Sequence, residues 1–536
     1  NGGTVASNGV AGNNNYNFAI GTGGRILALG GTTSAISASL GLNGQREFQV
    51  GAGSTLIVSG QVANWEGQAW GTINKTGAGV LQLTNSGNGY GGLMLSAGTV
   101  AVSAGSWANT GGNGYLADFQ GFATLTWAAG NTTDISASNK FRIGDGITAT
   151  LDTGTNTVTL GTAIVLGASK TGALTKVGAG TLTLSASNGY TGATTINGGV
   201  LALNNTNALA GGGNISFGGG TLQFSSNNTN DYSAKIKSSG SAISIDTNGN
   251  NVTFASILDS TNTGGFTKLG SGTLSMTSGA STFTGPVTIS QGAVSVTTNV
   301  NGGALSSASS LSVATGATLL MTTTSSGKNA LPVNAPWTIN GSLTISAAST
   351  GQDFGNNMTL NSGTVSGSGG SNYGWLYWYG GTLAATGTSA ISSASAIGFG
   401  SATVNTPNAG DILTISAPIG ASSANSGSLT KTGAGTLTLS GSNTYTGATT
   451  ISAGILSFGG TNSLRGTSGV TIAGGAGLTY TGGAATFGKN VTVTAGSGTG
   501  TITNSGGGLL TLSGNLSKDN SVLRLTGGSF NVTGLI

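Results

Sequence analysis

Lysine is the residue whose type and spacing first suggest a recurrent site in this chain. Charge is scarce, since the 536 residues include only 16 Lys or Arg and 12 Asp or Glu. Four lysines nevertheless open similar phrases, of which KTGAGTLTLSGSNTYTGATTISAGILSF is one, and they are Lys75, Lys176, Lys268 and Lys431. Ammonium groups this far apart form no continuous basic surface, and we expect them to lie solvated at corners of the fold.

Three aspartates precede three of these lysines at similar separations. Asp152, Asp246 and Asp411 lie 24, 22 and 20 residues ahead of Lys176, Lys268 and Lys431. If that separation equals one turn of a coiled repeat, each carboxylate lies close to an ammonium group of the adjacent turn. We therefore predict three ion pairs that fix the register where a repeat begins, each contributing about 0–1 kcal/mol if exposed.

The densest aromatic stretch is Tyr373-Gly-Trp375-Leu-Tyr377-Trp378-Tyr379. In a strand, side chains two residues apart share a face, so that Trp378 points away from the other four aromatic residues. Two interpretations stay open. The stretch is either a core stack with a covering loop, or an exposed strip that contacts a sugar or another subunit.

The composition argues against catalysis and against several classes of partner. The chain has no His and no Cys, and its 12 acidic residues are scattered, whereas polysaccharide lyases and hydrolases need converging carboxylates or Ca²⁺. We expect no catalytic, cofactor-binding or metal site. A formal net charge of +4 without a Lys/Arg run gives no expectation of nucleic-acid binding, and no apolar run reaches the length of a membrane span.

The elements that must position these residues are short strands. Leu437 and Leu439 alternate with Thr436 and Thr438, which places the leucines on the inner face of a strand and the threonines on the outer face. Leu182, Leu184 and Ile196 repeat the pattern, as does Ile451 in the strand that follows. The repeats share further positions, which include Gly180, Gly272, Gly435, Tyr190 and Tyr445.

Strands separated by glycine-rich turns are compatible with a sandwich, a propeller or a solenoid. The lysines lie 101, 92 and 163 residues apart, which argues against the equal blades of a propeller. We predict an all-β parallel β-helix with about 20–25 residues per turn, in which strands stack about 4.8 Å apart. Residues 1–130 are predicted to be a less regular β region or cap, and residues 131–536 the β-helix, with repeats at 75–102, 176–203, 268–296 and 431–458.

The pattern K-x-G-x-G-T-L-x-L, then N-x-Y-T-G-x-T-x-I, then x-x-G-x-L resembles the autotransporter-associated β-strand repeat, also called the passenger-associated transport repeat. Lys176–Leu203 and Lys431–Phe458 match it best. The resemblance implies a right-handed β-helix within a large, secreted, surface-displayed bacterial passenger, whose repeats assist export and folding.

We therefore predict an extracellular structural protein, a β-helical surface rod or fibre subunit for display, adhesion or filament formation. The alternative is a carbohydrate-binding or carbohydrate-cleaving β-helix, and a surface glycan is then the partner. Residues 521–536 alternate apolar side chains up to Ile536, so an open strand edge is predicted there, covered by another subunit or by further polypeptide. The chain begins without a signal-peptide pattern and is interpreted as a processed product or a piece of a longer one.

Overall fold

The structure is a computed structural model that describes residues 4–5, 18–21, 23–65, 71–105, 115–137, 140–324, 329–348, 352–354, 357–369, 375–378, 380–393, 395–420, 427–494 and 498–536. These residues form β-strands and turns with two short 3₁₀ segments, η2 (Ser233–Lys235) and η3 (Thr461–Leu464), and no α-helix occurs among them. Successive strands pair in parallel and coil into a β-solenoid of about 20 turns. The all-β parallel β-helix is thus confirmed, while its right-handedness stays a prediction.

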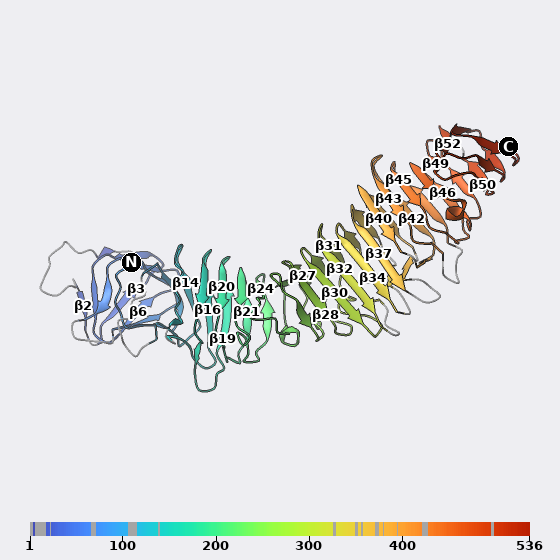
Figure 1. Cartoon of the computed structure of the whole chain (residues 1–536). Coiled ribbons are helices and arrows are strands. Elements are labelled where there is room, and N and C mark those ends of the chain that lie inside the picture. The colour runs from blue at the N-terminus through green and yellow to red at the C-terminus, as the bar shows by residue number, and fades with distance from the viewer. Residues whose placement is uncertain are drawn as a thin grey trace. The chain divides into compact units, whose positions relative to one another are not determined.

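The chain divides into two compact units, residues 1–250 and 251–536. In each unit the strands lie side by side as successive rungs (Figure 1). Parallel strands of this kind need a connection that returns to the same end of the sheet, and here the rest of each coil provides it. The sheets are therefore the walls of the coil.

The first unit contains four sets of paired strands. The ten-stranded sheet has the order β1 (Thr4–Val5), β4 (Thr33–Ile36), β7 (Thr55–Val58), β10 (Val80–Leu83), β12 (Gly98–Val102), β14 (Ala123–Trp127), β16 (Thr148–Asp152), β19 (Ala173–Val177), β21 (Thr194–Ile196) and β23 (Ile215–Phe217). The seven-stranded sheet has the order β18 (Val165–Leu166), β15 (Phe141–Ile143), β13 (Ala117–Phe119), β11 (Gly92–Leu95), β9 (Thr72–Thr76), β6 (Gln45–Val50) and β3 (Arg25–Ala28). The others are a three-stranded sheet of β2 (Phe18–Ile20), β5 (Leu40–Leu42) and β8 (Val62–Asn64), and the set β17 (Thr157–Leu160), β20 (Thr181–Leu184), β22 (Val200–Leu203), β24 (Thr221–Gln223) and β25 (Ile243–Asp246).

The second unit contains two long and two short sets of paired strands. The thirteen-stranded sheet has the order β26 (Val252–Phe254), β28 (Thr273–Met276), β30 (Ala293–Thr298), β32 (Thr318–Thr323), β34 (Ser342–Ala347), β37 (Thr364–Gly369), β40 (Thr388–Ser392), β43 (Ile412–Ile415), β45 (Thr436–Leu439), β47 (Ile455–Phe458), β49 (Gly477–Tyr480), β52 (Thr499–Asn504) and β55 (Val522–Gly527). A second wall runs through β27 (Phe266–Leu269), β29 (Pro286–Ile289), β31 (Ser310–Val313), β33 (Trp337–Ile339), β36 (Met358–Asn361), β39 (Thr382–Thr386), β42 (Ala402–Asn405), β44 (Leu429–Thr432), β46 (Thr449–Ile451), β48 (Val470–Ile472), β51 (Val491–Val493) and β54 (Leu516–Lys518). The three-stranded sheets are β35 (Gln352–Phe354), β38 (Leu376–Trp378) and β41 (Ile397–Phe399), and β50 (Ala485–Phe487), β53 (Leu510–Leu512) and β56 (Phe530–Val532).

The core is a set of apolar columns that run from coil to coil. Leu437 pairs in register with Leu413 on one side and with Leu456 on the other, and all three are fully buried. Leu439 is also fully buried, whereas Thr438 is partly exposed. The predicted register, with leucines inside and threonines outside, is confirmed, and it holds equally for Leu182, Leu184, Ile196 and Ile451.

The predicted boundary at residue 130 falls inside a continuous sheet. β12 pairs with β14 before that residue, and β14 pairs with β16 across it. That residues 1–130 form a less regular region stays a prediction.

Candidate functional site

The four repeat lysines point into the core. Lys75, Lys176, Lys268 and Lys431 lie on β9, β19, β27 and β44, and each is 0% exposed. Lys431 has Val404 and Ile451 as its register partners, so it occupies a position in an apolar column. The expectation of solvated ammonium groups is wrong, because these lysines have the same parity as the inward-facing residues of their strands and pack their methylene chains inside.

Each buried ammonium group donates to three main-chain carbonyls. Lys176 Nζ donates to Val177 O at 2.8 Å, Gly178 O at 2.9 Å and Gly198 O at 3.2 Å. The first acceptor is the last residue of the lysine's own strand, the second opens the turn that follows, and the third belongs to the next coil. The same three positions accept from Lys75 (Thr76, Gly77 and Ala97), Lys268 (Leu269, Gly270 and Gln291) and Lys431 (Thr432, Gly433 and Ala453).

This arrangement satisfies the donors of the ammonium group. An ammonium group has three N–H donors and no acceptor, and three carbonyl oxygens receive them. A buried cation without such partners would be strongly destabilising. We therefore define the lysine clip as one buried repeat lysine with its three carbonyl acceptors, which joins a turn of one coil to the turn of the next.

Glycine is required where the next coil crosses the clip. Gly454 follows the acceptor Ala453 and has φ +68°. A Cβ at Gly454 would overlap the carbonyl oxygens of Gly433 and Gly435, and Gly433 O is itself an acceptor of Lys431. The recurrence of a glycine at this position after each lysine thus reflects close backbone contact between two coils.

The predicted repeat glycines also lie at close approaches. A Cβ at Gly180 would overlap Asn156 O, and one at Gly435 would overlap Asp411 O. Gly272 adopts φ +89°. All three therefore shape the turn that carries the clip.

A second inter-coil contact comes from the asparagine of the N-x-Y segment. Asn443 Oδ1 accepts from Ile419 N at 2.8 Å, and its Nδ2 donates to Ser463 O at 2.6 Å. Asn188 makes the equivalent bonds to Ile164 N and Ala208 O. One buried amide therefore ties a coil to the coils before and after it. The N-x-Y pattern predicted no role for this asparagine, although its fixed place before the aromatic residue was a usable signal.

The predicted repeat tyrosines are buried beside these amides. Tyr445 is 0% exposed and its hydroxyl lies 2.7 Å from Thr449 Oγ1. Tyr190 lies 2.9 Å from Thr194 Oγ1 in the same way. Burial raises the pKa of Tyr445 to about 12, so the hydroxyl stays protonated and acts as a structural hydrogen-bonding group.

Two of the three predicted aspartate–lysine ion pairs do not form. No carboxylate oxygen of Asp152 or Asp411 comes within 4 Å of the ammonium nitrogen of Lys176 or Lys431. Among the described residues, the ion pair that forms is Arg142–Asp118. Asp411 instead accepts from the main-chain N–H groups of Gly387 and Asn408, and these bonds lower its pKa. The ion-pair prediction is wrong at these positions because the carbonyls already satisfy the lysines.

Asp152 still influences its lysine at longer range. It pairs in register with Val177, next to Lys176, and its charge raises the pKa of Lys176 against the larger, lowering effect of burial. Asp246 accepts from Gln223 Nε2 and Asn248 N within the first unit, whereas Lys268 belongs to the second unit. The pairing of Asp246 with Lys268 stays a prediction.

The clips give the fold a specific pH dependence. Burial lowers the pKa of Lys75, Lys176 and Lys431 from 10.5 to about 8. Between pH 8 and about 10.5 the unfolded chain therefore binds more protons than the folded chain, and the free energy of unfolding increases with pH. Tyr445, with its raised pKa, has the opposite effect above pH 10, where the unfolded chain loses a proton first.

We expect the midpoint of urea unfolding, followed by circular dichroism at constant ionic strength, to rise from pH 7 to about pH 10 and to fall above it. The variant Lys431→Met should show a smaller rise, since one titrating group is gone. A midpoint that stays constant or falls between pH 7 and pH 10 would contradict this assignment.

The aromatic stretch is buried where the structure describes it. Trp375, Tyr377 and Trp378 are 0%, 6% and 1% exposed, and β38 lies between β35 and β41. The indole N–H groups of Trp375 and Trp378 donate to Ser395 O and Gly380 O, so both rings can be buried without an unpaired donor. The interpretation as an exposed contact strip is wrong for these three residues, and Tyr373 and Tyr379 lie outside the described residues.

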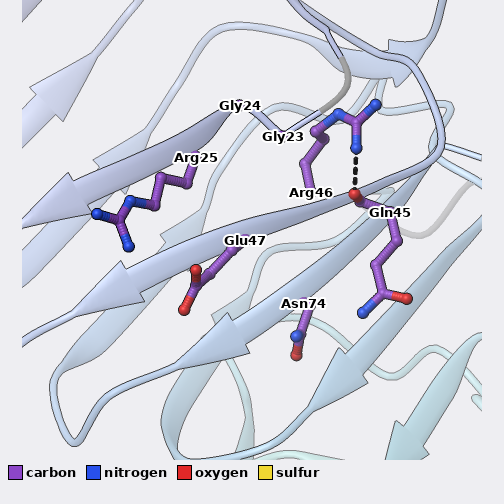
Figure 2. A pocket seen from close by; sticks show the side chains of 7 residues that line it. All are labelled: Gly23, Gly24, Arg25, Gln45, Arg46, Glu47 and Asn74. Atoms are coloured by element: carbon purple, nitrogen blue, oxygen red, sulfur yellow. Dashed lines mark hydrogen bonds between the residues drawn. The ribbon is translucent and has the colours of Figure 1, made fainter.

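The first unit also has a polar cavity that no feature of the sequence predicted. The cavity has a volume of about 800 Å³ and is lined by Gly23, Gly24, Arg25, Gln45, Arg46, Glu47 and Asn74 (Figure 2). Its residues come from β3, β6, β9 and the turn before β3. These positions are adjacent only after the strands stack, and no motif in the sequence marks them.

The described residues lack a metal-ligand cluster and a helix that could span a membrane. They contain no group of three or more His, Cys, Asp or Glu that could hold a metal ion. No helix of the length and hydropathy that a membrane span requires is found in the part of the chain that the structure describes.

Comparison with known proteins identifies the repeats. The passenger-associated-transport-repeat family matches residues 73–102, 174–203, 266–296 and 429–458. Each matched segment contains one lysine clip, and the predicted resemblance is confirmed. The Adhesin BmaC autotransporter of Brucella suis biovar 1 is 31% identical to the chain over 304 residues, which cover 52% of this chain and 8% of that protein. The chain thus spans a small part of the length of this relative. No solved structure matches the chain.

Proposed function

We propose, on the premise that this chain is a β-solenoid built around passenger-associated transport repeats, that it is part of the surface-exposed passenger of a bacterial autotransporter. The match of the four repeats to that family is the observation that carries the proposal. In this role the chain is an extracellular structural element that presents or spaces an adhesive surface, and it performs no catalysis.

The physical properties of the solenoid support such a role. Each coil contacts only its neighbours, so the fold can extend one coil at a time without a global core. The chain has no Cys, and folding therefore needs no disulfide formation outside the cell. The repeat lysines, together with Asn188 and Asn443, hydrogen-bond to main-chain groups of adjacent coils, so that contacts with the main chain join one coil to the next at these positions.

We further propose that the role is adhesion. A relative that shares 31% identity over 304 residues is named as an adhesin. The scattered acidic residues of this chain offer no converging carboxylates for sugar cleavage. Binding of a surface partner without turnover is therefore the function that these observations favour.

Surface display and adhesion can be measured separately. The chain would be fused between an export signal and an outer-membrane anchor in a Gram-negative host, with an epitope inserted at the exposed Ser226. We expect an antibody to label intact cells, and the labelled cells to attach to an epithelial layer more than cells displaying an unrelated solenoid do. Labelling that requires permeabilised cells would overturn the surface assignment. Labelling of intact cells that do not attach would contradict the adhesive role and support a spacer role.

A second candidate is end-to-end association into a filament. β54, β55 and β56 are each the last strand of their sheets and pair on one side only, and Val522 and Leu525 on β55 are 57% and 36% exposed. A parallel edge with exposed apolar side chains is a template for further strand pairing, either by another copy or by further polypeptide of a longer chain. A heterologous contact made there would extend the solenoid.

The double variant Val522→Lys/Leu525→Lys tests this association. If the edge joins another copy, sedimentation velocity should show concentration-dependent species in the parent chain and monomers in the variant, because like charges at an edge oppose pairing. Thr438→Lys, which adds a charge to an outward position away from the edge, is the control. A parent chain that sediments as a monomer at all concentrations would exclude the filament.

A further inference from the structure

The outer face of the seven-stranded sheet gathers charge in a chain that has little. One column of outward side chains is formed by the residues that pair in register on successive strands, Arg25, Glu47, Asn74, Met94, Asp118 and Arg142. Neighbours in such a column are about 4.8 Å apart along the sheet. An arginine and a carboxylate are therefore register partners twice, once at each end of the column.

At one end the charges are satisfied by each other. Arg142 Nε donates to Asp118 Oδ1 at 2.8 Å, and Arg142 Nη2 to Asp118 Oδ2 at 2.7 Å. Gln120 Nε2 lies 3.0 Å from both carboxylate oxygens, and the guanidinium lies 4.5 Å from the centre of the Tyr115 ring. This bidentate pair shows that arginine and carboxylate on adjacent strands of this sheet can reach each other.

At the other end of the column the arginine and the carboxylate do not form an ion pair. Arg25 and Glu47 are register partners, yet they form no ion pair within 4 Å among the residues that the structure describes. Glu47 Oε1 accepts instead from Thr76 Oγ1 at 2.7 Å. Arg25 is exposed, and the two side chains border the cavity of about 800 Å³ described above.

The side chains at this end face a common space. Figure 2 shows Arg25, Gln45, Glu47 and Asn74 on one side of the strands, with Arg46 pointing to the other side. The Arg46 guanidinium donates to the carbonyls of Ile20 and Gln45, so its charge is already engaged. The space is therefore bordered by one donor-only group, one acceptor-only group and two amides. Asn74 Oδ1 already accepts from Ser96 Oγ at 2.8 Å and Gln45 Nε2 lies 3.5 Å from Met94 Sδ, which leaves the Asn74 amide N–H groups and the Gln45 carbonyl for a ligand.

We propose that this cavity binds a neutral oligosaccharide, which makes it an adhesive site of the proposed surface function. Sugar hydroxyls both donate and accept hydrogen bonds, and a guanidinium, a carboxylate and two amides serve both directions. The charges of Arg25 and Glu47 cancel, and the carboxylate would repel a polyanion placed against the arginine. The lining has no large apolar side chain of the kind that anchors a protein partner.

The test uses the purified chain and an array that carries neutral hexose oligosaccharides, sialylated and sulfated glycans, with affinities then measured by titration calorimetry. We expect retention of neutral oligosaccharides, and a loss of about tenfold in affinity for Arg25→Gln and for Glu47→Gln, since each removes one charged hydrogen-bonding group. Arg524→Gln, at an exposed arginine of the second unit, is the matched control and should bind as the parent does. The urea midpoint of each variant shows whether it is folded.

Three outcomes would overturn the proposal. They are retention of charged glycans only, retention unaffected by both cavity variants, and no retention of any glycan by the folded chain. Because binding is measured on the purified chain, each of these leaves the surface-display experiment and its conclusion standing. Binding of neutral glycans by a chain that is not displayed on cells would instead support the site and contradict the proposed location.

Discussion

Replacing Lys431 with Met is expected to lower the free energy of unfolding by about 2–4 kcal/mol, because it leaves buried carbonyl oxygens without a donor. In the variant, Thr432 O still accepts a hydrogen bond from Thr406 N at 3.1 Å. Gly433 O and Ala453 O, however, lose the hydrogen bonds that the ammonium group donates to them. Methionine has a similar length and fills the column, so the loss measures the polar contacts more than a cavity.

The measurement should be local as well as global. Long repeat arrays can unfold in parts, so that one urea transition does not report every coil. Hydrogen exchange at the amides of β44, β46 and the turn before Gly454 should become faster in the variant. Lys518→Met, at an exposed lysine, is the matched control and should change stability by less than about 0.5 kcal/mol. Equal protection in both variants would show that the clip does not hold the coils together.

The same substitution at Lys75, Lys176 or Lys268 should have a comparable effect, since all four clips share their acceptor positions. If the clips hold separate pairs of coils, the effects of two substitutions far apart should add within about 0.5 kcal/mol. Coupling well above that value would indicate that the coils unfold as one unit.

Replacing Leu439 with Ala is expected to cost about 2–5 kcal/mol, the usual range for a leucine truncated in a close-packed core. Leu439 is fully buried and lies between Ile415 and Phe458 in its column. The neighbouring coils are fixed by main-chain hydrogen bonds on both sides, so they can collapse little around the missing methyl groups. The cost should therefore fall in the upper part of the range.

Thr438→Ala is the matched control for this prediction, because Thr438 is on the same strand with its side chain on the opposite, partly exposed face. We expect it to change the free energy of unfolding by less than about 0.5 kcal/mol in urea titrations. A larger loss for Thr438→Ala than for Leu439→Ala would mean that the inside and outside of the strand are exchanged.

The sequence by itself determined the fold class and the faces of its strands. Alternation of Leu437 and Leu439 with threonine was sufficient, because side chains in a strand alternate with a period of two and apolar ones must be buried. The four repeats were also recognisable, since K-x-G-x-G recurs with little variation. Even the inward position of Lys431 was implicit, because it lies two residues after the buried Leu429.

The tertiary structure alone decided what the charged residues do. Lys431 was predicted to be a solvated corner residue because its acceptors are main-chain carbonyls, which no residue type in the sequence indicates. Two of these acceptors follow Lys431 directly, but the third, Ala453 O, belongs to the next coil. Asp411 likewise found main-chain N–H partners instead of the predicted lysine. Arg25 and Glu47 are 22 residues apart and become neighbours only through the register of β3 and β6. Hydrophobic alternation is local and can be read along the chain, whereas hydrogen bonding of scarce polar groups depends on which backbone the stacking of coils brings within reach.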